Sequence, residues 1–121
     1  MGTISLLQLQ RHSRDRVSVH LDGDYAFSVA LDLAASLRKG QALSADDIAS
    51  LRAEDDYRRG LDRALSFLAH RPRSRQEVTR NLAAHDVPPD VAARVIGRLT
   101  ELALVDDAAF ARWWVENRTT H

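Results

Sequence analysis

The sequence has no cysteine, three prolines and few aromatic residues, 6% of the total. The lack of cysteine excludes disulfides, thiolate zinc sites and a thiol nucleophile. No apolar run approaches the roughly 18–20 residues of a membrane span, and no positively charged start precedes an apolar stretch, so we expect neither a membrane helix nor a signal peptide. These absences favour a cytoplasmic protein, and the 121 residues suggest one domain with at most a small appendage.

Neither sign of charge is in excess, because 17 basic residues balance 17 acidic ones. A wholly basic surface for nucleic acid is therefore absent. Lys39 is the only lysine, so arginine carries almost all of the positive charge. Genomic base composition, which also favours the many alanines, explains this bias, but arginine also suits bidentate contacts with carboxylates and phosphates. The local distribution of arginine is needed to separate the two explanations.

The first thirty residues have the pattern of strands. Residues 17–21 alternate apolar and polar side chains, and residues 25–29 do so again, with the period of two that half-buried strands show. Between them Asp22-Gly23-Asp24 predicts a turn, because glycine accepts positive φ and aspartate bonds locally to the backbone. The result is a hairpin, to which the stretch from Ile4 to Leu9 can add a third strand. A lone hairpin is marginal in water, so this element must pack on something else.

From residue 30 onward the pattern is helical. Residues 30–37 predict a short helix that ends at Gly40, its C-terminal cap. Ser44 is a good N-cap for a long helix that reaches about His70, with two aspartates in its first turn, where the helix dipole favours anions. The apolar stripe expected on this helix consists of Leu61, Leu65 and Leu68.

Pro72 breaks the helical pattern, because proline cannot continue the hydrogen-bond ladder. Ser74 and Glu77 then form a capping box, which marks the start of a new helix. Val78 and Leu82 are the expected buried residues of that helix.

Two further helices complete the pattern. The segment 87–90 ends one helix and begins the next, whose expected buried face is Val91, Val95, Ile96, Leu99 and Leu102. Asp106 caps a last helix, whose apolar residues are Phe110, Ala111, Trp114 and Val115. We therefore predict a compact three-helix unit with short connections from Tyr57 to Leu102.

The expected fold is mainly α, with a small amino-terminal β-hairpin or three-stranded element. Its parts are the hairpin and short helix (1–43), the long helix and first three-helix repeat (44–105), and the first helix of an incomplete second repeat (106–121). An offset of 51 residues suggests this repeat, because Asp55-Asp56 matches Asp106-Asp107 and His70 falls on His121. On this interpretation the architecture is a truncated tandem repeat, either a natural short form or a fragment of a longer protein.

Patterns typical of enzymes are absent. The five histidines lack a second ligand at i+4, no glycine-rich turn precedes a helix, and neither a nucleophile elbow nor the spacing of a catalytic triad occurs. The acidic residues Glu54, Asp55 and Asp56 have no ligand loop around them and are explained as helix-start or solvated acids. We therefore expect no catalysis, metal, cofactor or small-molecule substrate.

The strongest local feature is a cluster of five arginines, Arg63, Arg71, Arg73, Arg75 and Arg80. Three of them lie in one short loop at a helix N-terminus, where positive charge opposes the helix dipole. Charge in an unfavourable place indicates a partner, either acidic protein or phosphate. The alternative is a solvated loop in which arginine stems cover apolar surface. The candidate partner-binding residues here are Arg71, Arg73, Arg75 and Arg80.

Trp113 and Trp114 are adjacent, and neighbours on a helix point about 100° apart. Trp114 aligns with Phe110 and is expected in the core. Trp113 is then expected to face a further repeat or a partner, and it joins the candidate partner-binding residues. The alternative is partial burial of Trp113 against the preceding helix.

Two segments of the helical part form a recognisable combination. They are Arg71-Pro72-Arg73-Ser74 with Glu77 and Leu82, and Leu104-Val105-Asp106-Asp107 with Phe110-Ala111. With them the sequence resembles the RecX family of RecA modulators over nearly the whole chain. Two features resemble the longer members of the family, namely the Asp22-Gly23 hairpin and Gly40-x-x-Leu43-Ser44. The arginine loop followed by Asp-Asp-x-x-Phe-Ala at this spacing is the more specific part.

The resemblance implies tandem three-helix repeats and a non-catalytic regulator that binds the RecA filament on DNA. Such a protein restrains recombinase and coprotease activity in DNA repair and the SOS response. Family members typically have three repeats and only the first is complete here, so we expect weak binding by this chain, because modules that touch several protomers add avidity. In this hypothesis the four arginines meet acidic patches on RecA or DNA phosphates, and Glu54, Asp55 and Asp56 meet basic surfaces on the opposite side.

Two other interpretations remain open. A three-helix unit can be a helix-turn-helix DNA reader, with residues 91–102 as recognition helix and Arg94, Arg98 and Thr100 as polar candidates. A sequence-specific DNA-binding protein usually has more than three base-contacting side chains and an excess of basic over acidic residues. The other interpretation is a structural interaction module with an unrelated partner. Salt dependence separates phosphate binding from the rest, because phosphate-dominated binding weakens steeply with ionic strength.

Overall fold

The computed structural model describes residues 1–118, and the chain folds into two compact units, Met1–Asp55 and Asp56–His121. The division falls inside one long helix, α2 (Ala45–Leu68). Each unit has its own hydrophobic core. Among the described residues, no helix is both long and apolar enough to cross a membrane.

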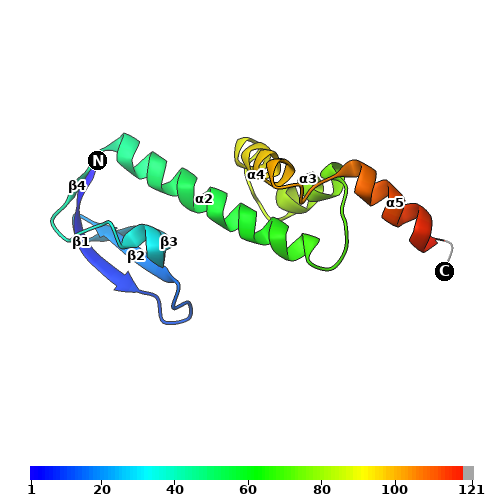
Figure 1. The fold of residues 1–121 in the computed structure, drawn as a ribbon. Coiled ribbons are helices and arrows are strands. Elements are labelled where there is room, and N and C mark those ends of the chain that lie inside the picture. The colour runs from blue at the N-terminus through cyan, green and yellow to red at the C-terminus, as the bar shows by residue number, and fades with distance from the viewer. Residues whose placement is uncertain (119–121) are drawn as a thin grey trace. The chain divides into compact units, whose positions relative to one another are not determined.

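The first unit is built on a four-stranded antiparallel sheet with the strand order β3-β2-β1-β4 (Figure 1). Its strands are β1 (Gly2–Leu9), β2 (Arg16–Leu21), β3 (Asp24–Ala30) and β4 (Ala42–Leu43). The predicted hairpin is β2–β3, and β1 is the third strand expected from the sequence. The short strand β4 was not predicted, and it pairs with the start of β1, where Gly2 lies opposite Leu43.

The β2–β3 hairpin turns through Asp22 and Gly23, which have positive φ angles of 53° and 93°. A two-residue turn of this kind matches the right-handed twist of the strands that it joins, and aspartate and glycine accept its φ values at little cost. The Asp22 carboxylate also accepts a hydrogen bond from the Thr3 backbone N–H (3.1 Å). The predicted turn is confirmed, and it also anchors the neighbouring strand β1.

Alternate side chains of the sheet form the core of the first unit. The buried strand residues are Ile4, Val17, Val19, Phe27 and Val29, and Ala34, Leu37 and Leu43 pack with them. Ile48 and Leu51 of α2 cover the same cluster. The hairpin thus has the packing partner that it needs, because an isolated hairpin is unstable in water.

The helix predicted over residues 30–37 is much shorter in the structure, where α1 covers Leu31–Ala34. The chain leaves the helix early because Leu37 is buried in the core and β4 must pair with β1. The prediction that Gly40 caps this helix is wrong. Gly40 has a φ of 89°, which glycine adopts freely, and this turn lets its N–H donate to the Ile4 carbonyl (2.8 Å).

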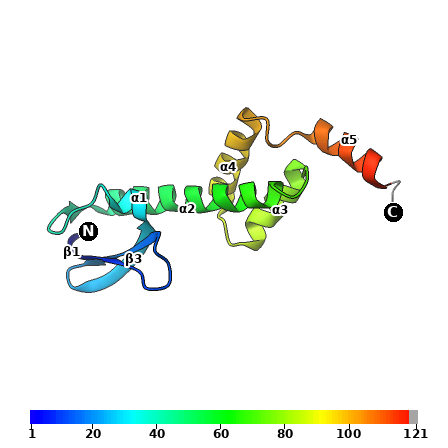
Figure 2. The ribbon, with the colours of Figure 1, turned by 60° about the horizontal axis from the view of Figure 1, so that its bottom comes forward.

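The second unit contains the end of α2 and three further helices. These are α3 (Arg75–Ala84), α4 (Pro89–Glu101) and α5 (Asp107–Arg118). Figures 1 and 2 show α3 and α4 beside the end of α2, with short connections between them, and α5 following α4 along the chain. The predicted three-helix unit is confirmed.

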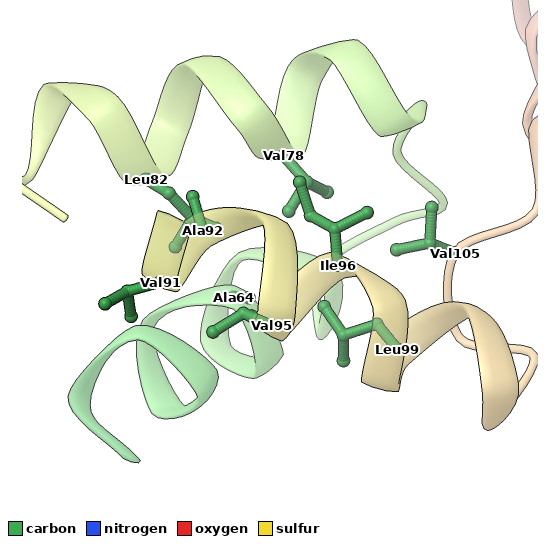
Figure 3. Packing of buried hydrophobic residues seen from close by; sticks show 9 residues of the cluster. All are labelled: Ala64, Val78, Leu82, Val91, Ala92, Val95, Ile96, Leu99 and Val105. Atoms are coloured by element: carbon green, nitrogen blue, oxygen red, sulfur yellow. The ribbon is translucent and has the colours of Figure 1, made fainter. Parts of the chain in front are cut away.

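The core of the second unit lies between α2, α3 and α4. Its buried residues are Ala64, Val78, Leu82, Val91, Ala92, Val95, Ile96, Leu99 and Val105. Figure 3 shows Val78 and Leu82 pointing from α3 toward α4. Gly60 lets α4 approach α2 closely, because a Cβ atom there would lie 3.2 Å from a methyl group of Val95.

Two residues predicted for this core lie outside it. Leu65 is 40% exposed on α2, and its neighbour Ala64 is fully buried instead. Leu102 is 46% exposed, because α4 ends at Glu101 and the chain then turns through Ala103, which has a φ of 58°. The buried face of α2 therefore contains Ala64 and not the predicted Leu65.

Polar caps begin α2 and α5 where the sequence predicts them. The Asp47 N–H donates to the Ser44 hydroxyl (3.0 Å), and the Ser44 N–H donates to the Asp47 carboxylate (2.9 Å). Hydrogen bonding of the Asp47 carboxylate by the Ser44 backbone N–H, and then by the Ser44 side chain, holds the pKa of Asp47 below its ordinary value. Asp106 accepts a hydrogen bond from the N–H of Ala108 (2.9 Å) and so caps α5.

The aspartates matched by the internal offset of 51 residues have different structural roles. Asp106 is an N-cap outside α5, whereas Asp55 lies in the interior of α2 and is 3% exposed. The match of Asp55 to Asp106 therefore does not pair equivalent positions. His121, which the offset pairs with His70, lies outside the described residues.

Candidate partner-binding surface

The loop between α2 and α3 runs through Pro72 and ends at the N-cap Ser74. The Ser74 hydroxyl accepts from the Glu77 N–H (3.1 Å), and the Glu77 carboxylate accepts from the Ser74 N–H (3.2 Å). The predicted capping box is therefore complete, and it fixes where α3 begins. It also places a carboxylate in the middle of the arginine cluster.

Arg71 is held by several neighbours. Its Nη2 donates to Glu77 Oε2 (2.8 Å) and its Nη1 donates to the Pro72 carbonyl (2.8 Å). Its guanidinium carbon lies 4.6 Å from the centre of the Trp113 ring and 5.9 Å from that of Phe110, within the range of cation–π attraction. Arg71 therefore fastens the loop to α5.

Arg73 fastens the same loop to the end of α2. Its Nε donates to the Phe67 carbonyl (3.2 Å), and its guanidinium carbon lies 4.0 Å from the centre of the Phe67 ring. Its Nη1 also lies 3.9 Å from a carboxylate oxygen of Glu77. Only 16% of the Arg73 side chain is exposed, so little of it is left for a partner.

Glu77 is the carboxylate partner that these two arginines share. Partial burial raises the pKa of Glu77, but hydrogen bonds from Arg71 and the Ser74 N–H, together with the positive charges of Arg71 and Arg73, outweigh it and lower the pKa below its ordinary value. The carboxylate is therefore ionised at neutral pH. One carboxylate offsets only one of the two positive charges, so the expected cost to stability is reduced for Arg71 and Arg73 but not removed.

The other two candidate arginines present their guanidinium groups to solvent. The Arg75 backbone N–H donates to Asp107 (2.9 Å), whereas its guanidinium makes, within the described chain, one hydrogen bond of 3.4 Å to Thr100. Arg80 is exposed on α3. Of the four predicted arginines, Arg75 and Arg80 are thus the better placed to meet another molecule.

The two tryptophans have the reverse of their predicted environments. Trp114, expected in the core, is 51% exposed. Trp113 is half-buried because the Arg71 guanidinium covers its ring and the Phe110 ring stacks on it, with ring centres 6.1 Å apart. The alternative stated for Trp113, partial burial, describes it better, although the loop and not a preceding helix covers it.

Glu54, Asp55 and Asp56 do not form one acidic surface. Asp55 is buried and accepts two hydrogen bonds from Arg16, at 2.7 and 3.0 Å, and a third from the Ala30 N–H at 2.9 Å. The expectation that Asp55 meets a basic surface of a partner is therefore wrong, because its oxygens are occupied inside the first unit.

A sequence signal for the burial of Asp55 exists. Ile48, Leu51 and Asp55 lie at i, i+3 and i+7, so the aspartate occupies an apolar position of α2. A carboxylate on a buried face needs a charged partner. Arg16, at the start of β2, is that partner, and nothing in the local sequence identifies it.

The three residues suggested for DNA reading are engaged within the second unit. The Arg94 guanidinium carbon lies 3.9 Å from the centre of the Tyr57 ring, and Arg98 pairs with Glu101 at 3.2 Å. The Thr100 hydroxyl donates to a carbonyl of the preceding turn (2.8 Å). These contacts compete with base-edge hydrogen bonds and weaken the helix-turn-helix interpretation.

The surface thus offers the outward-facing guanidinium groups of Arg75 and Arg80, which suit an acidic partner. Within residues 1–118, no group of three histidine, aspartate or glutamate side chains is placed to hold a metal ion.

Comparisons with known proteins agree with the resemblance seen in the sequence. Residues 61–99 match the family described as RecX, first three-helix domain. The chain is 35% identical to the regulatory protein RecX of Lacticaseibacillus paracasei over 118 residues, 96% of this chain and 49% of that protein. It is 36% identical to the regulatory protein RecX of Bacillus subtilis over 117 residues, 95% of this chain and 44% of that protein. The chain therefore spans about half the length of these relatives.

A solved structure has a similar fold. The crystal structure of a regulatory protein RecX matches with a TM-score of 0.68 at 28% identity, over 96% of this chain and 58% of that one. The match covers both the amino-terminal sheet and the helical unit, because it leaves almost none of this chain out.

Proposed function

We propose a function from one premise: this chain belongs to the RecX family, and it spans about half the length of the relatives compared above. Those relatives are named regulatory proteins, a name that states no reaction. We infer that the chain is a non-catalytic regulator that binds the RecA filament on DNA and restrains its activity. The observation that carries this proposal is the three-helix unit of α2, α3 and α4, whose connection between α2 and α3 holds Arg71 and Arg73.

The geometry suggests a structural role for two of the four arginines and a binding role for the other two. Arg71 and Arg73 hold the loop in shape, because both are bonded to Glu77 and to groups on α2 or α5. Arg75 and Arg80 face outward and are proposed to meet acidic patches of RecA protomers or DNA phosphates in the filament. Arginine suits either contact, because its planar fork of donors matches carboxylates and phosphates.

Binding would regulate the filament by favouring one of its states. A ligand shifts an equilibrium only as far as its affinities for the two states differ. The chain is therefore proposed to bind the assembled filament more tightly than free RecA, in a form that hydrolyses ATP more slowly. The Arg71 guanidinium covers the Trp113 ring. Trp113 is therefore proposed to support the loop and to contact the partner only with the part of its side chain that remains exposed.

The test is binding of this chain to RecA filaments on single-stranded DNA, with ATP hydrolysis by RecA as the second readout. We expect binding and slower hydrolysis, and we expect the double variant Arg75→Glu, Arg80→Glu to lose about tenfold or more in affinity, because two favourable charge contacts become repulsive. A fold control is circular dichroism of the double variant.

The matched control is Arg52→Glu, which reverses an exposed arginine of the first unit. It should leave filament binding unchanged. If the double variant and the wild type bind alike, the arginine surface is not the contact. If the wild type binds naked single-stranded DNA as tightly as filaments and loses both with salt, phosphate binding replaces RecA recognition.

A further inference from the structure

An apolar groove lies between α3 and α4. Its main lining residues are Arg75, Thr79, Ala83, Ala92, Ala93 and Ile96. Val87 from the connection between the two helices and Pro89 at the start of α4 complete the wall at one end, and Arg75 belongs to the opposite end of α3. The groove was not predicted, because the alanines that form it had been explained by base composition.

Small side chains create this groove. The large residues of the two helices, such as Val78 on α3 and Val95 on α4, point into the core, as Figure 3 shows. The neighbouring positions on the outer side carry Thr79, Ala83 and Ala93, which are too short to fill the space between the helices. The result is a hollow of about 370 Å³, within the range of roughly 300–1,000 Å³ that small binding pockets have.

The polar atoms around the hollow are largely satisfied, with one exception. The Thr79 hydroxyl donates to the Arg75 carbonyl (2.9 Å), and the Thr100 hydroxyl donates to the Ile96 carbonyl (2.8 Å). The Arg75 guanidinium, in contrast, makes no ion pair with any carboxylate of residues 1–118, and its bond to Thr100 is long at 3.4 Å. The groove therefore has an apolar wall, and beside it lies the Arg75 guanidinium, which can pair with a carboxylate of another molecule.

We propose that this groove receives one aliphatic or aromatic side chain of the protein partner, and that Arg75 pairs with a carboxylate of the same partner segment. The inference rests on the proposed function and names the kind of RecA surface that the chain recognises. Burial of an apolar anchor beside a charge pair at the rim is the arrangement typical of a binding hot spot.

Nucleic acid fits this groove poorly. A phosphodiester placed against the alanine wall would lose its hydration with only one guanidinium to replace it, which is costly. Bases bind single-strand readers by stacking on aromatic rings, and the groove has no aromatic residue. A protein segment with an apolar side chain and a nearby acid satisfies both parts of the groove.

The experiment fills the groove with Ala83→Leu and compares it with Ala84→Leu, the neighbouring exposed alanine outside the groove. Leucine is almost as good a helix former as alanine, so both variants should fold, as urea unfolding will check. We expect Ala84→Leu to bind RecA filaments like the wild type. Ala83→Leu should lose about tenfold or more, because burying one large apolar side chain contributes that much affinity.

A second variant tests the proposed charge pair of Arg75 at the edge of the groove. Arg75→Glu places an acid at the first residue of α3, where the helix dipole favours it but Asp107 opposes it, and urea unfolding checks that the variant folds. We expect its affinity to fall as well, and the combination with Ala83→Leu to lose less than the sum of the two losses, because both act on one partner segment.

Three outcomes would overturn this inference. If the wild type binds filaments and Ala83→Leu binds equally, the groove is not used, although the proposed function stands. If the wild type does not bind filaments, the proposed function fails and the inference fails with it. If sedimentation shows that the wild type self-associates and Ala83→Leu does not, the occupant is a second copy of this chain and not RecA.

Discussion

At the scale of single residues, the charged side chains of this chain divide into those that hold the fold and those that face outward. Arg16 and Asp55 pair inside the first unit, and Arg71 pairs with Glu77 in the second. Sequence patterns show where such charges lie along the chain but not which of them find partners. The distinction matters because a charge that already has a partner contributes little to recognition.

Glu77→Gln tests the charge balance of the arginine loop. Glutamine can keep the hydrogen bond to the Ser74 N–H but not the charge that Arg71 and Arg73 face. We expect a loss of about 1 kcal/mol in the free energy of unfolding at pH 7, measured with urea. Glu101→Gln removes a pair that is 70% exposed on its acidic side, and it should change the stability by much less.

The same variant predicts a pH dependence. The pKa of Glu77 is lower in the folded protein than its ordinary value of 4.5, so the ionised carboxylate stabilises the fold fully above pH 4.5. This stabilisation is lost as the pH falls through the lowered pKa. The difference in stability between wild type and Glu77→Gln should therefore shrink from pH 7 to pH 3, and a constant difference would contradict this account.

Asp55→Asn tests the buried ion pair of the first unit. Removing the carboxylate charge leaves the Arg16 guanidinium buried without its counter-ion, which costs ~3–5 kcal/mol in comparable pairs. We expect a loss of this size in urea unfolding, together with faster hydrogen exchange at the Ala30 N–H, which donates to Asp55. The control Asp56→Asn, at the next position, should stay within about 0.5 kcal/mol of the wild type. Equal effects of the two variants would show that the ion pair does not fasten α2 to the sheet.

At the scale of elements, caps set where the helices begin, and small residues contribute to their packing beside the buried leucines. The buried face of α2 includes the small residues Gly60 and Ala64. On the outer side of α3 and α4, alanines leave the groove described above. α5 differs from them, because none of its residues is buried. Its aromatic side chains are ordered by stacking on one another and on Arg71.

The environments of the two tryptophans give an optical test of α5. The variant Trp113→Phe keeps Trp114, which is 51% exposed, and Trp114→Phe keeps Trp113, which the Arg71 guanidinium covers. We expect acrylamide to quench the fluorescence of Trp113→Phe more strongly than that of Trp114→Phe. The reverse order would mean that Trp114 is the packed tryptophan, as the alignment with Phe110 predicts.

Short sequence motifs predicted most of the helices and strands. The features that were not predicted depend on contacts between residues far apart in the sequence. The Asp22-Gly23 turn and the Ser74 capping box act over a few residues, so the sequence was enough to place them. Strand β4 forms only because β1 lies beside it, and Asp55 is buried only because Arg16 reaches it. The site was predicted as a run of arginines, but which of them faces outward depends on Glu77, Phe67 and α5.

At the scale of the whole molecule, the chain joins an amino-terminal sheet unit to a helical unit in which residues 61–99 match the family described as RecX, first three-helix domain. The first unit closes its own core with side chains from the sheet and the start of α2, and its buried acid is used internally. The second unit presents the outward arginines and the apolar groove. We therefore expect partner recognition to reside in the second unit.

The central claim is that this chain recognises RecA filaments and not DNA alone. The most direct measurement is the ratio of its affinity for RecA filaments on single-stranded DNA to its affinity for the same DNA without RecA, at moderate salt. The account predicts a ratio well above ten that rises as salt is added, because protein contacts would dominate filament binding whereas binding to DNA alone weakens steeply with salt. A ratio near one, with both affinities falling steeply as salt is added, would contradict it.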